Sequence, residues 1–309
     1  SLAYKDRIPE ADCAVVERVL AAGAIMLGKT NSPEFGLLGA NENRLGEPCR
    51  NPWNPERTSG GSSGGAAASI VAGLSSLATG GDGGGSIRIP ASFNGIYGIK
   101  PSQGRVSNYS GVNSISAANY TSQQGPLTRT VRDSAVLLQV IAGYDNRDPG
   151  SLRATVPDFE SAVDRGIEGL RMGWSSDFGY ASVDPEVKEV SEKAAMVFAE
   201  LRCDVDDAGL KLDGAFDTWF KLFSLNAYLT QGHLLEDPDD PLSWYARWAI
   251  EEGSKVTGSD YARAVGERDR MIQQFADEFE KYDILLSPTM AVTAFSTDQY
   301  PQEIDGQDP

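Results

Sequence analysis

Two glycine-rich stretches decide the fold of this chain: Gly60-Gly61-Ser62-Ser63-Gly64-Gly65 and Gly80-Gly81-Asp82-Gly83-Gly84-Gly85-Ser86-Ile87-Arg88-Ile89-Pro90. Glycine tolerates unusual backbone dihedrals and lets another chain segment approach closely. In the second stretch several backbone N–H groups can converge near the Ser86 hydroxyl, which is what an oxyanion hole requires. Composition alone favours a flexible linker. However, each stretch adjoins an apolar helix or strand, and we therefore interpret both as ordered catalytic loops.

The first stretch also contains G-x-S-x-G twice, around Ser62 and around Ser63. This pattern is typical of the nucleophile elbow of serine hydrolases that use a histidine base. The chain has a single histidine, His233, beside an acidic turn. A lone histidine carries no sign of a catalytic partner, and we predict a solvated surface residue. A serine–histidine triad is therefore disfavoured.

A formal phosphate-binding motif, G-x-x-x-x-G-K-[ST], occurs at residues 23–30. A true P-loop follows a strand and opens a helix. Here a predicted helix comes first, the residues between the two glycines are apolar, and Asn31-Ser32-Pro33 stands where a helix must continue. We therefore do not expect a nucleotide site.

The composition excludes several classes of function. The chain has 309 residues, of which 40% are hydrophobic and 23% charged, and this is typical of a soluble globular protein. The formal charge of −17 repels a phosphate backbone, so we expect no nucleic-acid partner. No apolar run approaches the roughly 20 residues of a membrane span. Three scattered cysteines and the lack of a signal peptide pattern predict a cytoplasmic protein.

Hydrophobic periodicity predicts an alternation of helices and strands. Helices are expected after Asp12 up to Gly23, and at residues 66–72, 131–142, 185–201, 216–253 with an acidic interruption at 236–241, and 261–281. Buried strands are expected at residues 24–27, 77–79, 96–99, 170–174 and 284–286. This alternation indicates an α/β fold with helices on both faces of a sheet.

Beyond the two stretches, several runs occur in a particular order: Gly28-Lys29-Thr30-Asn31, Asn51-Pro52-Trp53 and Gly98-Ile99-Lys100-Pro101. Together with the glycine-rich stretches they resemble the amidase signature family. The resemblance covers nearly the whole chain and is specific over residues 23–105. It implies an α/β fold with a mixed central sheet, and a single amidase domain over residues 1–309 that is incomplete at both ends. The signature core is expected at about residues 23–142.

The resemblance implies a Ser–Ser–Lys mechanism without histidine. Ser86 corresponds to the nucleophile that becomes acylated, and Ser62 to a bridging serine on a cis peptide bond after Gly61. The oxyanion would be held by the N–H groups of Gly83, Gly84, Gly85 and Ser86. Ser63, Asp82 and Arg88 are expected to orient the serines; for Asp82 and Arg88, an ordinary ion pair or turn cap is an equally open interpretation.

The lysine of this mechanism has no match in the chain. The resemblance places it upstream of Ser1, because the residues around Lys5 match the family after the true site. Lys29 belongs to a strand-end motif and is expected to be structural. Gly81 and Gly83 stand where the family has larger residues, which predicts a more flexible oxyanion loop.

The leading hypothesis is hydrolysis of a carboxylic amide to a carboxylate and ammonia or an amine, through an acyl-enzyme and without cofactor or metal. The first alternative is the glutaminase-type A subunit of a tRNA-dependent amidotransferase, which the acidity disfavours. The second is a catalytically inactive homologue or fragment that acts as a binding domain. We expect a small-molecule amide as partner, no membrane, and a homodimer as the candidate assembly.

Six aromatic residues are candidates for a substrate pocket, although core packing is their commoner role: Trp53, Tyr109, Tyr120, Trp219, Trp244 and Tyr245.

Overall fold

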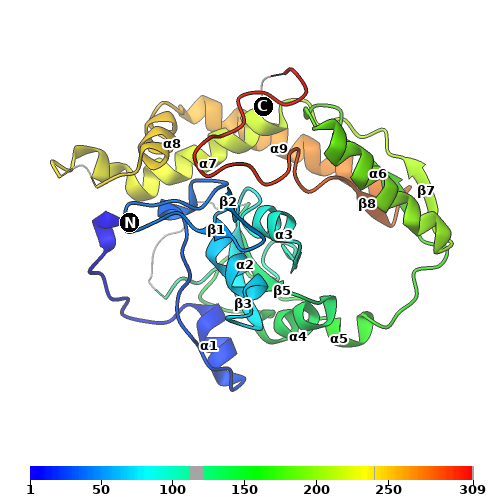
Figure 1. Cartoon of the computed structure of the whole chain (residues 1–309), viewed down its shortest axis with the longest axis horizontal. Helices are drawn as coiled ribbons and strands as arrows, with labels where there is room; N and C mark the ends of the chain where they lie inside the picture. The colour runs from blue at the N-terminus through cyan, green and yellow to red at the C-terminus, as the bar shows by residue number, and fades with distance from the viewer. Residues whose placement is uncertain (112–120, 240, 308–309) are drawn as a thin grey trace. The chain divides into compact units, whose positions relative to one another are not determined.

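The computed structural model describes residues 1–111, 121–239 and 241–307, and its helices and strands confirm the α/β class (Figure 1). The chain divides into two compact units. Unit 1 comprises Ser1–Asp164 and Phe223–Ser254, and unit 2 comprises Arg165–Leu222 and Lys255–Pro309. Both glycine-rich stretches lie in unit 1. The expectation of a single amidase domain stays a prediction.

Unit 1 holds two antiparallel sheets. A two-stranded ribbon pairs β1 (Arg50–Asn51) with β2 (Asn54–Thr58). A three-stranded sheet has the order β3-β5-β4, from β3 (Leu77–Asp82), β5 (Gln123–Thr128) and β4 (Tyr97–Gly98). In the register of β3 on β5, Asp82 lies opposite Gln123. The sheet therefore delivers the chain at Asp82 directly into the loop that carries Ser86.

The helices of unit 1 are α1 (Ala14–Ala21), α2 (Gly64–Val71), α3 (Arg88–Asn94), α4 (Val131–Ile141), α5 (Phe159–Ala162) and α8 (Trp244–Ser254), with the 3₁₀ turns η1 (Leu2–Tyr4), η2 (Glu34–Gly36) and η3 (Gly232–Glu236). Of these helices, α2, α3 and α4 contact the three-stranded sheet. Helix α2 contacts β3, β5 and α3 (Figure 1). Helix α7 (Ala215–Gln231) begins in unit 2 and ends in unit 1.

Small residues allow α2 to pack closely. Its alanines favour the helix and are buried at Ala66 and Ala67. A side chain on Gly64 would lie 2.6 Å from Ser59 Oγ, and one on Gly65 would overlap the backbone of Asn31. These glycines are therefore required by close backbone approach at the start of the helix.

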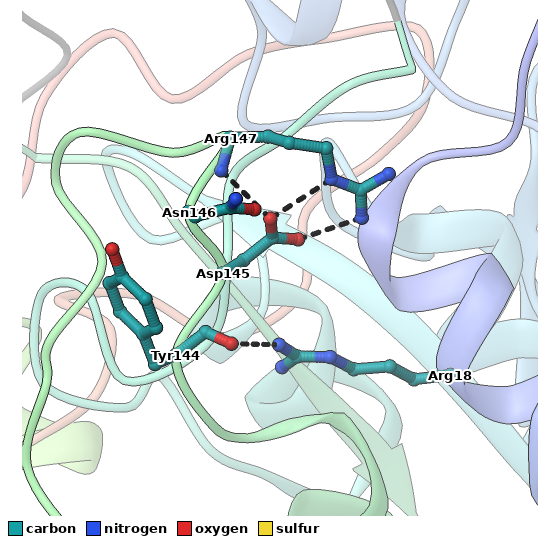
Figure 2. A pocket seen from close by; sticks show the side chains of 5 residues that line it. All are labelled: Arg18, Tyr144, Asp145, Asn146 and Arg147. Carbon is teal, nitrogen blue, oxygen red and sulfur yellow. Dashed lines mark hydrogen bonds and ion pairs between the residues drawn. The ribbon is translucent and has the colours of Figure 1, made fainter.

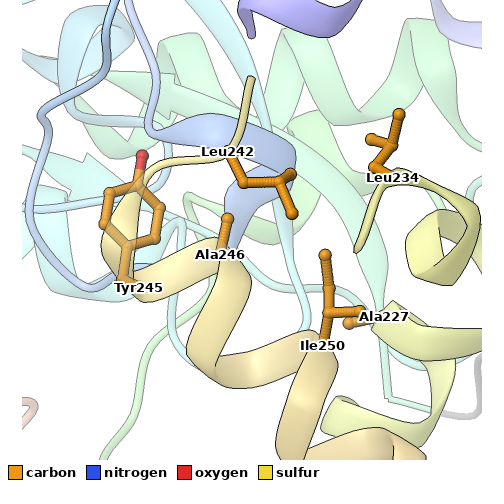
Figure 3. Packing of buried hydrophobic residues seen from close by; sticks show 6 residues of the cluster. All are labelled: Ala227, Leu234, Leu242, Tyr245, Ala246 and Ile250. Atoms are coloured by element: carbon orange, nitrogen blue, oxygen red, sulfur yellow. The ribbon is translucent and has the colours of Figure 1, made fainter. Parts of the chain in front are cut away.

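Three apolar clusters stabilise unit 1. One joins α1 to α4 and contains Val15, Val106, Leu137, Leu138 and Ile141. A second lies under the serine loops and contains Ala66, Ile87, Ala91 and Leu127. Figure 3 shows the third, which centres on α8 and contains Ala227, Leu234, Leu242, Tyr245, Ala246 and Ile250.

Unit 2 holds a parallel sheet of order β7-β6-β8, from β7 (Asp204–Asp207), β6 (Arg171–Trp174) and β8 (Ile284–Leu286). Parallel neighbours need crossover connections, which α6 (Pro185–Glu200) and α9 (Gly258–Phe279) belong to. Asp184 caps α6 ahead of Pro185, and Thr257 and Asp260 form a capping box on α9. These caps explain why both helices begin where they do.

Most predicted helices are confirmed, but some details of the predictions are wrong. Helix α1 begins at Ala14 with Cys13 as its N-cap, and so not directly after Asp12. The predicted buried strand at residues 24–27 is wrong: Ile25 is 87% exposed and Leu27 76% exposed, and none of the described strands pairs with this segment. The predicted strands at 77–79 and 284–286 exist but are partly exposed. The acidic interruption lies between α7 and α8, where residue 240 is outside the described residues.

Across the described residues, no helix is both long and apolar enough to cross a membrane.

Candidate active site

Ser62 lies in a turn whose backbone is closely packed. The peptide bond between Gly61 and Ser62 is cis, as the resemblance implies. A side chain on Gly61 would lie 2.6 Å from the Leu38 carbonyl oxygen and would overlap that of Ala40. Only glycine fits here, because the segment from Leu38 to Ala40 lies directly against it. The Ser62 side chain is half-buried.

Ser63 joins the two glycine-rich stretches. Its N–H donates to the Ser86 carbonyl at 3.1 Å, and its Oγ donates to the Gly81 carbonyl at 3.4 Å. Gly80 lies so close to the Ser63 side chain that a Cβ there would overlap it. Ser63 is therefore a buried link between the loops, which is consistent with the predicted orienting role. Its place at the start of α2 fixes Ser62 beside it.

Asp82 organises the loop that carries Ser86. Its side chain is fully buried and accepts hydrogen bonds from the N–H groups of Gly85 at 2.7 Å and of Ile87 and Arg88 at 3.3 Å each. The Arg88 guanidinium adds two bonds at 2.8 and 2.9 Å. The carboxylate thus holds both the loop and the first turn of α3. The predicted ion pair exists, and it also orients the backbone around Ser86.

The charge of Asp82 is retained inside the protein. Burial opposes ionisation and is the largest single influence, but the hydrogen bonds and charge of Arg88, with the N–H groups of Gly85 and Arg88, outweigh it. The pKa of Asp82 is therefore lowered. The hydrogen bond to Asp82 in turn raises the pKa of Arg88.

The N–H groups of the loop differ in what they can bind. The Gly85 N–H already donates to Asp82. In contrast, neither the Gly84 nor the Ser86 N–H donates to any residue that the structure describes. Gly84 is exposed and Ser86 half-buried. Of the predicted oxyanion donors, the Gly84 and Ser86 N–H groups therefore have no partner among the described residues, whereas the Gly85 N–H holds the loop to Asp82.

The turn η2 contributes a contact that the sequence did not predict. Gly36 has φ of +72°, and a methyl group built on it would lie 3.3 Å from Ser62 Oγ. The preceding residue, Phe35, also has a positive φ of 53°. This turn therefore faces the Ser62 hydroxyl and leaves slightly less room than a methyl group at Gly36 needs.

Lys100 is a half-buried cation near this site. Burial lowers its pKa, the charge of Asp82 opposes that shift, and the charge of Arg88 adds to it. Its Nζ donates to the Pro101 carbonyl at 3.4 Å. The Gly98-Ile99-Lys100-Pro101 run marked this residue as part of a motif, but its electrostatic coupling to Asp82 was not predictable from spacing.

Two residues that were not expected in the site lie as predicted: His233 is exposed, with its Nε2 3.2 Å from Tyr4 Oη, and Lys5 is exposed. Lys29 is exposed as well, but no strand precedes it over the described residues 1–28, so its predicted place at a strand end is wrong. No helix follows the formal phosphate-binding motif over residues 28–33. Among the candidate aromatics, Tyr245 is buried, whereas Trp53 is 75% and Trp244 60% exposed. Tyr120 lies outside the described residues.

A separate surface pocket of about 480 Å³ lies between α1 and the segment after α4 (Figure 2). It is lined by Arg18, Tyr144, Asp145, Asn146 and Arg147. Arg147 pairs with Glu17 and Asp145, and its hydrogen bond lowers the pKa of Asp145 to about 2. Arg18 donates to the Gly143 and Tyr144 carbonyls. Because both guanidiniums have protein partners, we interpret this pocket as a structural clamp.

The described part of the chain contains no group of three or more His, Cys, Asp or Glu side chains that could hold a metal ion.

Comparison with known proteins supports the resemblance to the amidase signature family. The family model described as Amidase matches residues 1–308. An acylamidase of Rhodococcus erythropolis is 35% identical over 306 residues, which cover 97% of this chain and 63% of that protein. The A subunit of the glutamyl-tRNA(Gln) amidotransferase of Chromohalobacter salexigens is 37% identical, with 92% of this chain and 63% of that protein covered.

A solved structure gives the same result for the fold. A bacterial aryl acylamidase belonging to the amidase signature enzymes superposes with a TM-score of 0.87 at 31% identity. The match covers 96% of this chain and 63% of that chain. The chain thus spans about 63% of the length of the relatives it matches.

Proposed function

Because this chain belongs to the amidase signature family, we propose that it carries the serine centre of an enzyme that hydrolyses a carboxylic amide. One observation carries the proposal: the Ser63 N–H bond to the Ser86 carbonyl joins the two serine loops, directly beside Ser62. The products would be a carboxylate and ammonia or an amine.

In the proposed reaction Ser86 is the nucleophile. Its Oγ attacks the amide carbonyl carbon while its proton passes to Ser62 Oγ, whose own proton passes to a lysine base. The N–H groups of Gly84 and Ser86 hydrogen-bond the resulting oxyanion, and one such donor is typically worth about 3 kcal/mol. The proton then returns from the lysine through Ser62 to the amide nitrogen, the C–N bond breaks, and the amine leaves. Water attacks the acyl-enzyme, which releases the carboxylate and returns a proton to Ser86 Oγ. Asp82 keeps the loop in place through its bonds to Gly85 and Arg88.

The substrate class follows from the relatives. One is named an acylamidase and a solved neighbour an aryl acylamidase, and both names describe cleavage of acyl amides. We therefore propose a small-molecule amide as substrate. A cytoplasmic location and a homodimer remain predictions of the same kind.

An amidotransferase role is the second candidate. Several relatives are named as the A subunit of a glutamyl-tRNA(Gln) amidotransferase, at up to 38% identity. Against this role, the net charge of −17 disfavours the approach of a polyanion such as tRNA. A binding domain without activity is the third candidate, and the experiment below separates it from both enzymes.

The test is active-site labelling of the natural full-length protein with a fluorophosphonate, followed by peptide mapping. We expect the label on Ser86, its loss in Ser86→Ala, and slower labelling in Ser62→Ala. An unlabelled wild-type protein would favour the binding domain. A label on Ser63, or a rate that depends on His233, would overturn the assignment.

A further inference from the structure

The turn η2 contacts two parts of unit 1 that are far apart in sequence. On one side, a methyl group on Gly36 would lie 3.3 Å from Ser62 Oγ. On the other side, the Glu34 carboxyl group contacts the residue before α8, since its Oε2 accepts a hydrogen bond from the Ser243 N–H at 2.6 Å. Three residues therefore connect the start of α8 to the predicted relay serine.

Glu34 is an unusual residue for this position. It is only 2% exposed, and its second oxygen, Oε1, has no hydrogen-bond partner among the described residues. Burying a carboxyl group is unfavourable unless its oxygens are bound. The N-terminal end of α8 offsets part of the unfavourable free energy of burying the Glu34 carboxyl group, because helix N-termini favour acidic groups. A buried polar group with one free oxygen indicates a role that an apolar side chain would not fill.

Tyr245 fixes the backbone of the same turn. Its hydroxyl accepts a hydrogen bond from the Glu34 N–H at 2.6 Å and donates one to the Glu42 carbonyl at 2.7 Å. The side chain is 2% exposed, and burial raises its pKa to about 12. The hydroxyl therefore remains protonated and keeps both bonds at physiological pH.

The turn itself depends on these contacts. Phe35 and Gly36 both have positive φ, at 53° and 72°, and such a conformation persists in Phe35 only where surrounding structure holds it. Phe35, Leu37 and Leu38 pack against the α8 cluster that Figure 3 shows. The apolar contacts and the two buried polar groups thus hold the turn from the same side.

We propose that Glu34 and Tyr245 are positioning residues that hold the Glu34–Gly36 turn against the Ser62 hydroxyl and so orient it for proton transfer. Neither touches a reacting atom. The proposal rests on the function proposed above, because it assigns these residues to the relay serine of that reaction. Loss of the orientation slows the chemical step, while reagent binding at Ser86 is unaffected.

The test compares Tyr245→Phe, Glu34→Leu and Glu34→Gln with wild type in the natural full-length protein. Fluorophosphonate labelling gives the maximal rate, kinact, and the binding constant, KI. Misplacement of a reacting group by about 1 Å is enough to lower a rate by about 100-fold. We expect Tyr245→Phe and Glu34→Leu to lower kinact about tenfold or more with KI unchanged. Glu34→Gln retains an acceptor for the Ser243 N–H and is expected to restore most of the rate.

Arg44→Met is the matched control. It removes the bond from Arg44 Nη1 to the Leu242 carbonyl, at 3.1 Å, two residues before α8, and leaves the hydrogen-bonding groups of Glu34 and Tyr245 in place. Rates are compared per folded molecule, with thermal unfolding of every variant. If Glu34 and Tyr245 have a purely structural role, Tyr245→Phe and Glu34→Leu lower the folded fraction and leave kinact unaltered, or they lower kinact no more than the control does. Either outcome would overturn the proposal.

Hydrogen exchange provides a readout that does not depend on activity. The Gly36 and Leu37 N–H groups bond to the Pro33 and Glu34 carbonyls, each at 3.1 Å. We expect these amides to exchange faster in Tyr245→Phe and Glu34→Leu, and not in Arg44→Met. Unchanged exchange would refute the positioning of the turn. Absence of any label on wild-type Ser86 would instead refute the proposed function, together with the catalytic consequence assigned here.

Discussion

At the scale of single residues, Gly36 gives the sharpest probe of Ser62. In Gly36→Ala the new methyl group lies 3.3 Å from Ser62 Oγ, which is tighter than ordinary contact. We expect the hydroxyl to shift and the labelling rate at Ser86 to fall about tenfold or more. The positive φ of 72° adds a loss of stability of about 1 kcal/mol. Stopped-flow labelling and urea unfolding measure the two effects separately.

Gly73→Ala is the control for this substitution. Gly73 has nearly the same φ, 71°, but a side chain there meets no atom within 4 Å. It therefore reports the backbone effect alone, and its labelling rate is expected to equal that of wild type. Equal rates in the two variants would show that the Gly36 contact does not constrain Ser62.

Asp82 gives a prediction for pH dependence. In Asp82→Asn the Arg88 guanidinium loses its ionic partner, and we expect a stability loss of about 2 kcal/mol at pH 7, since Arg88 is half-exposed. The pKa of Asp82 is lowered from 3.8 in the folded protein, so the unfolded state binds its proton first as pH falls. The stabilisation that ionised Asp82 provides is therefore complete above its unfolded-state pKa of 3.8, and it is lost as pH falls through the lower pKa of the folded protein.

Urea unfolding of wild type and Asp82→Asn across acidic pH measures this. The stability difference is expected to be constant from about pH 7 to pH 5 and to narrow below about pH 4. A difference that instead grows on acidification would contradict a stabilising, ionised Asp82.

The candidate site residues Ser62, Ser63 and Ser86 stay predictions, but the close approach of the loops that carry them was predictable from local sequence. Glycine and serine in fixed order marked these loops, because close backbone approach demands glycine locally. Glu34 and Tyr245 carried no such signal. Their contacts join positions about 200 residues apart, for example Ser243 and Glu34 at a separation of 209. A single sequence contains no record of such a pairing.

At the scale of elements, α4 tests how firmly the apolar framework supports unit 1. Ile141, the last residue of α4, is fully buried in the cluster that joins α4 to α1. Ile141→Ala leaves a cavity, and we expect it to lower the free energy of unfolding by about 3 kcal/mol. Val136→Ala on the same helix, at a position 37% exposed, is expected to lower it by less than about 1 kcal/mol. Calorimetry measures the loss in both variants. Equal losses of unfolding free energy would show that this apolar cluster does not stabilise unit 1 more than an exposed position does.

Elements were predictable where periodicity decides them. The amphipathic spacing of 131–142 and 185–201 gave α4 and α6 almost to the residue. Strands depend on a partner, which the sequence does not name. Residues 24–27 are apolar but pair with none of the described strands, whereas β5 contains Gly125 and Pro126 and still forms the centre of its sheet. Pro126 is tolerated there although proline is rare in central strands.

At the scale of the whole molecule, charge is the property that the sequence determines most directly. The 44 acidic and 27 basic residues give a net charge of −17 without any knowledge of the fold. The division into two units was not predictable, because no change of composition marks Asp164 or Phe223. Charge is also what separates the two enzyme candidates, since only one of them has to approach a polyanion.

The net charge of −17 on these 309 residues disfavours binding of tRNA to this part of the protein. Non-specific binding to nucleic acid depends on basic side chains that release counterions, and even basic proteins bind non-specifically with Kd of only about 1–100 µM at physiological salt. We therefore expect no gel shift of tRNA at about 10 µM full-length protein, and none when the salt is lowered. A basic tRNA-binding protein serves as the positive control. Saturable binding that tightens as salt falls would instead favour the amidotransferase role. Such binding is electrostatic, and in a protein with a negative net charge it would require a localised basic site for the phosphates of tRNA.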